Sequence, residues 1–206
     1  MKSLNTLFAT LLLIGAGSAF AASTVDLTVR GLITPSACKP DLSNGGNVDL
    51  GKISARDLNA DKPTTLAGQS LQLSVTCDAQ TLMALEAKDN RKGSAYIEQY
   101  DLFGLGLINS TEKLGAMEMR LINAVADGVA GRMIASEDGG LTWYYERYFT
   151  HDNILSVANI GIDAPLPVQL FTADMMISPI IAPASGLTLN NEVAIDGSVT
   201  LTVKYL

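Results

Sequence analysis

The stretch Val199-Thr200-Leu201-Thr202-Val203-Lys204-Tyr205, at the carboxyl end, decides the fold class of this chain. Apolar residues occupy positions 199, 201 and 203, and polar residues stand between them. Because successive side chains of a β-strand point to opposite faces, this alternation predicts a strand with one buried face and one exposed face.

The same period of two returns along the whole chain. Apolar and polar residues alternate in five further stretches, namely 25–29, 71–77, 83–87, 117–121 and 166–170, the last through Leu166, Val168 and Leu170. Turn-forming clusters such as Asn44-Gly45-Gly46-Asn47 and Asp138-Gly139-Gly140 separate them. Short alternating strands divided by such turns predict an all-β fold, an antiparallel β-sandwich.

The first 21 residues have the features of an export signal. Lys2 is followed by the apolar stretch from Leu4 to Ile14 and by Ala19-Phe20-Ala21, a small-x-small cleavage site. The alternative, a membrane anchor, needs a longer apolar run to cross about 30 Å of hydrocarbon. The sequence therefore predicts a signal peptide at residues 1–21. It predicts a single domain at residues 22–206, with no membrane span in the mature chain.

The charge of the mature chain argues against nucleic acid as a partner. Without Lys2 it has 13 basic and 21 acidic residues, a net charge of −8. Binding to phosphates requires clustered Lys and Arg, and the sequence has no such cluster.

Cys38 and Cys77 are the two cysteines of the chain. Export to an oxidising compartment makes a disulfide between them the expected state. Closing a loop of about 40 residues would stabilise the fold by roughly 4 kcal/mol in the simple loop model. The alternatives are a metal site and a catalytic thiol, but His151 is the only histidine available to complete a metal shell. We therefore expect no metal and no cofactor.

No set of catalytic residues stands out. His151 and Asp152 are adjacent, so on a strand they would point to opposite faces. The sequence has no G-x-S-x-G nucleophile motif and no dinucleotide-binding motif. We expect a protein that is not an enzyme, and a secreted glycoside hydrolase is the least favoured alternative.

Five of the twelve aromatic residues lie in the segment from Trp143 to Phe149. If this segment is a strand, Trp143 and Tyr145 point one way and Tyr144 and Tyr148 the other. These four side chains are the candidates for contact with a sugar or another receptor. The alternative is a core strand with tyrosines at its rim. Just before it, Ser136-x-Asp138-x-Gly140-x-Thr142-Trp143 resembles the Asp-box of sialidases and predicts a stabilised hairpin.

Four segments together resemble subunits of chaperone–usher pili. They are a Gly-containing stretch that ends in Ala-Cys at 29–38, the V-x-L-G stretch at 47–53, the strand ending in the second cysteine at 72–78, and the alternating terminal strand with penultimate Tyr205 at 196–206. The ending Asp196-Gly197-Ser198 is most similar to an uncharacterised fimbrial-like branch.

The resemblance implies an immunoglobulin-like, pilin-type sandwich that lacks its final strand. Val199, Leu201, Val203 and Tyr205 would then face a strand supplied by a periplasmic chaperone and later by a neighbouring fimbrial subunit. The implied partners include an usher, and the implied route runs through the periplasm to a fimbrium at the cell surface. The alternative is that these side chains pack inside a complete sandwich.

The amino-terminal end departs from this pattern. Pilins carry a donor extension ahead of the first strand, and here only residues 22–28 precede the match. Val25 and Leu27 alternate suitably for a donor segment. The alternative is that they begin the first strand, in which case the chain is a tip or terminating subunit, or a relative that does not polymerise.

Overall fold

The structure of the protein is a computed structural model, and it describes Thr28 and residues 37–206. In this part of the chain, strands make up nearly all the regular secondary structure. Short 3₁₀ turns interrupt them at Ser43–Gly46, Ala55–Asp57 and Ala184–Gly186. None of the helical segments in this part is long and apolar enough to cross a bilayer. The expected signal peptide, the donor candidates Val25 and Leu27, and residues 29–36 lie outside the described residues.

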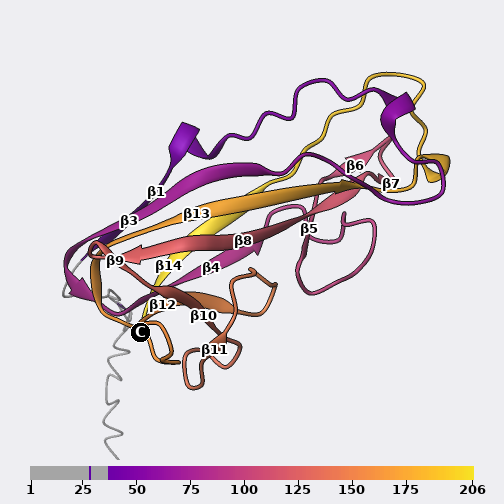
Figure 1. Cartoon of the computed structure of the whole chain (residues 1–206). Helices are drawn as coiled ribbons and strands as arrows, with labels where there is room; N and C mark the ends of the chain where they lie inside the picture. The colour runs from indigo at the N-terminus through magenta and orange to yellow at the C-terminus, as the bar shows by residue number, and fades with distance from the viewer. Residues whose placement is uncertain (1–27, 29–36) are drawn as a thin grey trace, which may run out of the picture. The chain divides into compact units, whose positions relative to one another are not determined.

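The first sheet has the strand order β1-β3-β13-β8-β5. Its members are β1 (Cys38–Leu42), β3 (Gln69–Thr81), β13 (Val168–Ile181), β8 (Gly115–Ala126) and β5 (Leu102–Gly104). Two short strands extend it, β2 (Thr64–Thr65) beside β13 and β9 (Val129–Ala130) beside β8. Figure 1 shows the long strands β3, β13 and β8 running side by side.

The second sheet has the order β11-β10-β12-β4-β14. Its members are β11 (Tyr144–Tyr145), β10 (Arg132–Ser136), β12 (Ile154–Ala158), β4 (Met83–Asp89) and β14 (Val199–Tyr205). A separate ribbon joins β6 (Leu107–Ile108) to β7 (Glu112–Lys113). Neighbouring strands in both sheets are antiparallel, which confirms the all-β, antiparallel sandwich expected from the sequence.

One apolar core lies between the two sheets. Alternate residues of β3, including Leu73 and Val75, are fully buried, as their period of two predicts. Leu121 and Phe171 join them from the first sheet. The second sheet contributes several fully buried side chains to the same cluster, among them Leu85, Leu155 and Val157.

The disulfide between Cys38 and Cys77 is present, as expected. The two residues are directly opposite in the register of β1 and β3, with their Cα atoms 4.0 Å apart. The bond therefore joins an edge strand to its only partner in the described sheet, and it closes a loop with a sequence separation of 39.

The expectation that Leu170 points inward with Val168 is wrong. Val168 is fully buried, but Leu170 is 45% exposed, and the register of β13 shifts between them. The carboxylate of Asp127 accepts the backbone N–H groups of Gln169 and Leu170, at 3.0 and 2.7 Å. This contact accompanies a bulge, after which the inward set continues from Phe171.

We predict that replacing both cysteines by alanine lowers the free energy of unfolding by about 2–5 kcal/mol, because the unfolded chain gains the entropy of an open loop. Urea denaturation of the oxidised wild type and of the double variant would measure this. A loss below about 1 kcal/mol would mean that the bond does not restrain the β1 edge.

Candidate strand-binding groove

A groove with a volume of about 1060 Å³ opens along one side of the sandwich. It is bordered by Leu42 at the end of β1 and by Val199 and Leu201 on β14, the two outermost strands on that side. Its floor is apolar and comes mainly from buried residues of the first sheet, namely Leu71, Met117, Met119, Met175, Ile177 and Ile181. The groove is thus an open section of the core.

The backbone of β14 has a free edge along this groove. Within the described residues β14 pairs only with β4. Asn90 donates to the carbonyl of Ser198, and Leu206 donates to the carbonyl of Leu82. Since hydrogen-bonded pairs alternate in an antiparallel ladder, the even-numbered residues of β14 face β4. The N–H and C=O groups of Val199, Leu201, Val203 and Tyr205 therefore point to the free edge.

Two extended segments continue the borders of the groove beyond the strands. We call residues 48–53 the first rim and residues 189–195 the second rim. Both line the groove, and no backbone–backbone hydrogen bond links either rim to another described segment. Figure 1 shows the indigo segment that contains the first rim and the yellow segment that contains the second rim, which leads into β14. None of the residues in either rim is buried, so water can reach these backbone groups and a partner strand can replace it.

The second rim is held at its ends. Before it, the backbone N–H of Thr188 donates to Glu112 Oε2 at 2.6 Å, and this contact lowers the pKa of Glu112. After it, the backbone N–H of Asp196 donates to the carbonyl of Leu105, and the carboxylate of Asp196 forms an ion pair with Arg91. These anchors fix the position of the rim and leave its backbone available.

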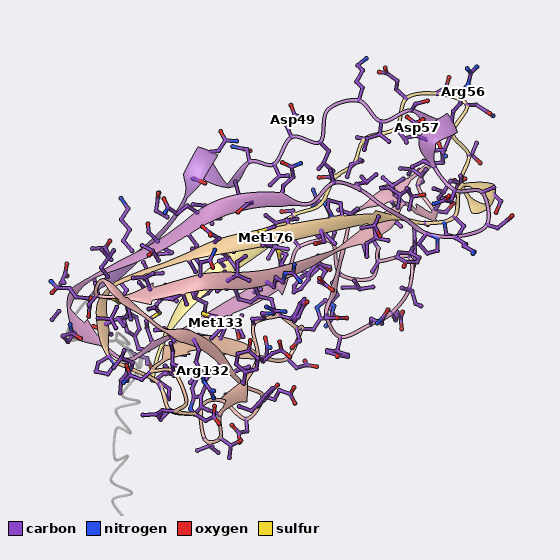
Figure 2. All side chains as sticks on the ribbon, in the orientation of Figure 1. Asp49, Arg56, Asp57, Arg132, Met133 and Met176 are labelled. Carbon is purple, nitrogen blue, oxygen red and sulfur yellow. A yellow bond between two sulfur atoms is a disulfide. The ribbon has the colours of Figure 1, made fainter. Side chains whose placement is uncertain are left out.

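The first rim is held by a local turn and one surface ion pair. Asp49 accepts the backbone N–H of Gly51 at 2.8 Å, and Gly51 has a φ of +65°. Lys52 reaches Glu192 of the second rim at 2.8 Å, with both side chains almost fully exposed. Such a pair adds little stability. Figure 2 shows Asp49 on the segment that carries this rim, outside the sheets.

The structure divides the four predicted contact residues into two groups. Val199 and Leu201 line the groove. Val203 packs partly buried against the core, outside the groove lining, and Tyr205 is 43% exposed. The hydroxyl of Tyr205 accepts the backbone N–H of Cys38 at 2.9 Å, which links the two outermost strands at this end.

Sequence reasoning missed the second rim and the methionine floor. A signal for the rim existed, because Leu187, Leu189, Val193 and Ile195 continue the alternation of β14 toward the amino terminus. Asn191 and Gly197 interrupt it. The alternation of residues 117–121 also predicts that Met117 and Met119 point inward. However, no local pattern tells whether such an inward side chain lies in a closed core or on the floor of an open groove.

The aromatic segment forms less strand than expected. Only Tyr144–Tyr145 is a strand, β11, and its side chains have different contacts. Tyr144 donates to Glu137 at 2.7 Å, and partial burial together with that carboxylate raises its pKa to about 12. Tyr145 lies beneath Arg132, and Tyr148 accepts from Arg120. These candidate receptor residues, with Trp143, take part in separate internal contacts.

The Asp-box hairpin forms as its motif predicts. Asp138 Oδ1 accepts the backbone N–H groups of Leu141 and Thr142, at 3.0 and 2.9 Å. The hydroxyls of Thr142 and Ser136 also donate to this carboxylate. These contacts, with the Thr142 hydroxyl foremost, hold the pKa of Asp138 far below its usual value. Trp143 closes the turn by donating to the carbonyl of Gly140.

His151 takes part in a structural contact. Its Nε2 lies 2.9 Å from the carbonyl oxygen of Leu102, and its ring packs on Phe103 at 4.9 Å. Among the described residues, no group of three or more His, Cys, Asp or Glu side chains is placed to hold a metal ion.

The fold and the groove define an antiparallel β-sandwich with an open apolar side beside its terminal strand. Residues 27–101 match a family described as proteins of unknown function, DUF1120. Protein GltF of Escherichia coli (strain K12) is 28% identical over 242 aligned positions, which cover 94% of this chain and 93% of GltF. The uncharacterized protein YhcF of the same strain is 26% identical over 232 positions, covering 93% and 97%. The chain is similar to both proteins over nearly its whole length.

We predict that the hairpin keeps its structure as the pH falls from 7 to about 4, and loosens only below that. Because the folded pKa of Asp138 lies below its unfolded value of about 3.9, its contribution is complete above the unfolded pKa and is lost as pH falls through the folded pKa. The fluorescence of Trp143, the only tryptophan, would report this.

In Asp138→Asn the change in Trp143 environment should already be present at pH 7. The control is Asp61→Asn, at an exposed turn before β2. Identical acid profiles for wild type and Asp138→Asn would show that this carboxylate does not hold the hairpin.

Proposed function

We propose that this protein is an exported, fimbrial-type structural subunit whose groove receives a β-strand from another polypeptide. The observation that carries the proposal is the free edge of β14 beside an apolar groove with unpaired rims. An inserted strand would pair its backbone with this edge and place alternate side chains on the methionine floor.

The chemistry of the groove favours a polypeptide over a small ligand. Its borders offer backbone donors and acceptors in a row, spaced as in a strand, and its floor is apolar. The floor methionines Met117, Met119 and Met175 are flexible and adapt to side chains of different shape. An exposed edge of this kind promotes aggregation unless it is covered, so a dedicated partner also protects the protein.

The resemblance to chaperone–usher pilins supports a proposal for the partners. In this proposal a periplasmic chaperone covers the groove first, an usher receives the complex, and a neighbouring subunit then replaces the chaperone strand at the cell surface.

The alternative of a carbohydrate-binding adhesin module stays a prediction. Tyr145 is 58% exposed and Tyr144 is 39% exposed, so both could be reached by a receptor. However, Glu137, Arg132 and Arg120 already contact the tyrosines of this segment, which does not favour a stacking platform. We therefore rank this function second.

We predict that Leu201→Asp reduces complex formation with the chaperone at least about tenfold, because it places an unpaired charge in the apolar groove. Thr202→Asp is the matched control, since it adds the same charge one residue along on the exposed face. The measurement is the yield of complex when each chain is co-expressed in the periplasm with the chaperone of a chaperone–usher cluster from the same genome.

Thermal unfolding of both variants would separate loss of binding from loss of folding, and Leu201→Ala gives a milder change at the same site. Equal complex yields for Leu201→Asp and Thr202→Asp, with both folded, would contradict the proposal.

A further inference from the structure

We propose that Tyr205 and Pro40 end the strand-binding groove, and so determine how far an inserted strand can pair along β1. The inference rests on the proposed function, because it specifies the register of the partner strand. It comes from the hydrogen-bonding capacity of β1, the outermost strand of the first sheet.

The outward-facing groups of β1 follow from its pairing with β3. Asp78 donates to the carbonyl of Ala37, and the register then pairs Lys39 with Thr76 and Asp41 with Ser74. Because hydrogen-bonded pairs alternate in an antiparallel ladder, the backbone groups of Cys38, Pro40 and Leu42 point away from β3. They face the side of the sandwich on which β14 is also unpaired.

Two of these three positions cannot donate to an inserted strand. The N–H of Cys38 is already bound to the hydroxyl of Tyr205 at 2.9 Å. Pro40 has no N–H, a common way of protecting an edge strand. Only Leu42 has an N–H without a partner among the described residues. Over its first half the edge of β1 therefore offers a partner strand only carbonyl acceptors, and at Leu42 it offers both a donor and an acceptor.

The residues that line the groove agree with this difference between Leu42 and the first half of β1. The groove is lined by Leu42 on one side and by Val199 and Leu201 on the other. Cys38 and Tyr205, whose contact joins the two sheets at this end, do not line it. An inserted strand therefore finds both donors and acceptors on its two sides only from Leu42 toward the two rims. Next to Cys38 and Pro40, β1 has no free N–H to donate, and β14 is the one neighbour that offers both kinds of group.

Tyr205 is thus a positioning residue, and the conservative variant Tyr205→Phe isolates its hydroxyl. The ring and its packing remain, and the N–H of Cys38 becomes available. Tyr144→Phe is the matched control, because it also removes a hydroxyl hydrogen bond, on β11 at the other edge of the second sheet.

The test is amide hydrogen exchange on the full chain, with and without a synthetic peptide. The peptide carries valine at alternate positions with lysine or threonine between them, and has about twelve residues to span the groove. In wild type we expect the peptide to slow exchange at Leu42 and Leu201 at least about tenfold, and to leave Cys38 unchanged. In free Tyr205→Phe, Cys38 should exchange faster than in wild type, and the peptide should then slow it.

Three outcomes would overturn the inference. Equal exchange of Cys38 in free wild type and free Tyr205→Phe would show that the hydroxyl does not hold this N–H. Protection of Cys38 by the peptide in wild type would show that the groove continues past Tyr205. Protection of Leu201 without Leu42 would show that β1 takes no part. If the peptide protects none of these amides in any variant, the proposed strand-binding function fails together with the inference. The three outcomes above would instead overturn the inference alone.

Discussion

The structure depends on one constraint, an unpaired backbone edge beside an apolar floor. Val199, Leu201 and Val203 turn their side chains toward the core and their backbone groups toward the free edge of β14. Water can satisfy the backbone groups but not the apolar floor, and an apolar partner can cover the floor but not satisfy the backbone. A β-strand with alternating side chains meets both requirements at once.

The other elements in the described part of the chain keep this edge in place without covering it. The disulfide fixes β1 to β3, and the contact between Tyr205 and Cys38 brings the two outermost strands together at one end. Farther along, Glu112 and Arg91 anchor the second rim at both ends and leave its backbone unpaired. The exposed pair of Lys52 and Glu192 is the only ion pair between the rims in the described part of the chain, and its exposure makes it easy to separate.

Local sequence patterns predicted most of the strands and only part of the candidate groove, namely Val199 and Leu201. The alternation of residues 199–205 matches β14 residue for residue, because a period of two is a property of the strand itself. Leu170 was misplaced because Asp127, a residue far away in the sequence, captures its N–H and shifts the register. The aromatic segment is a strand only at Tyr144–Tyr145, in the second sheet. Farther on, the backbone of Arg147 and Phe149 bonds to Leu121 and Met119 of β8, in the first sheet, so the segment passes from one sheet to the other. The groove itself depends on β14 having β4 as its only partner among the described strands, and no local period records that.

The most direct test of the central claim compares neighbouring amides within β14 in the isolated protein. The amides of Thr202 and Lys204 face β4, and those of Leu201 and Val203 face the free edge. Hydrogen exchange should therefore be slow at the first pair and fast at the second, and the second pair should become slow in the complex with the strand donor. Equal and strong protection of all four amides in the isolated protein would mean that the edge is already covered, and would contradict the account.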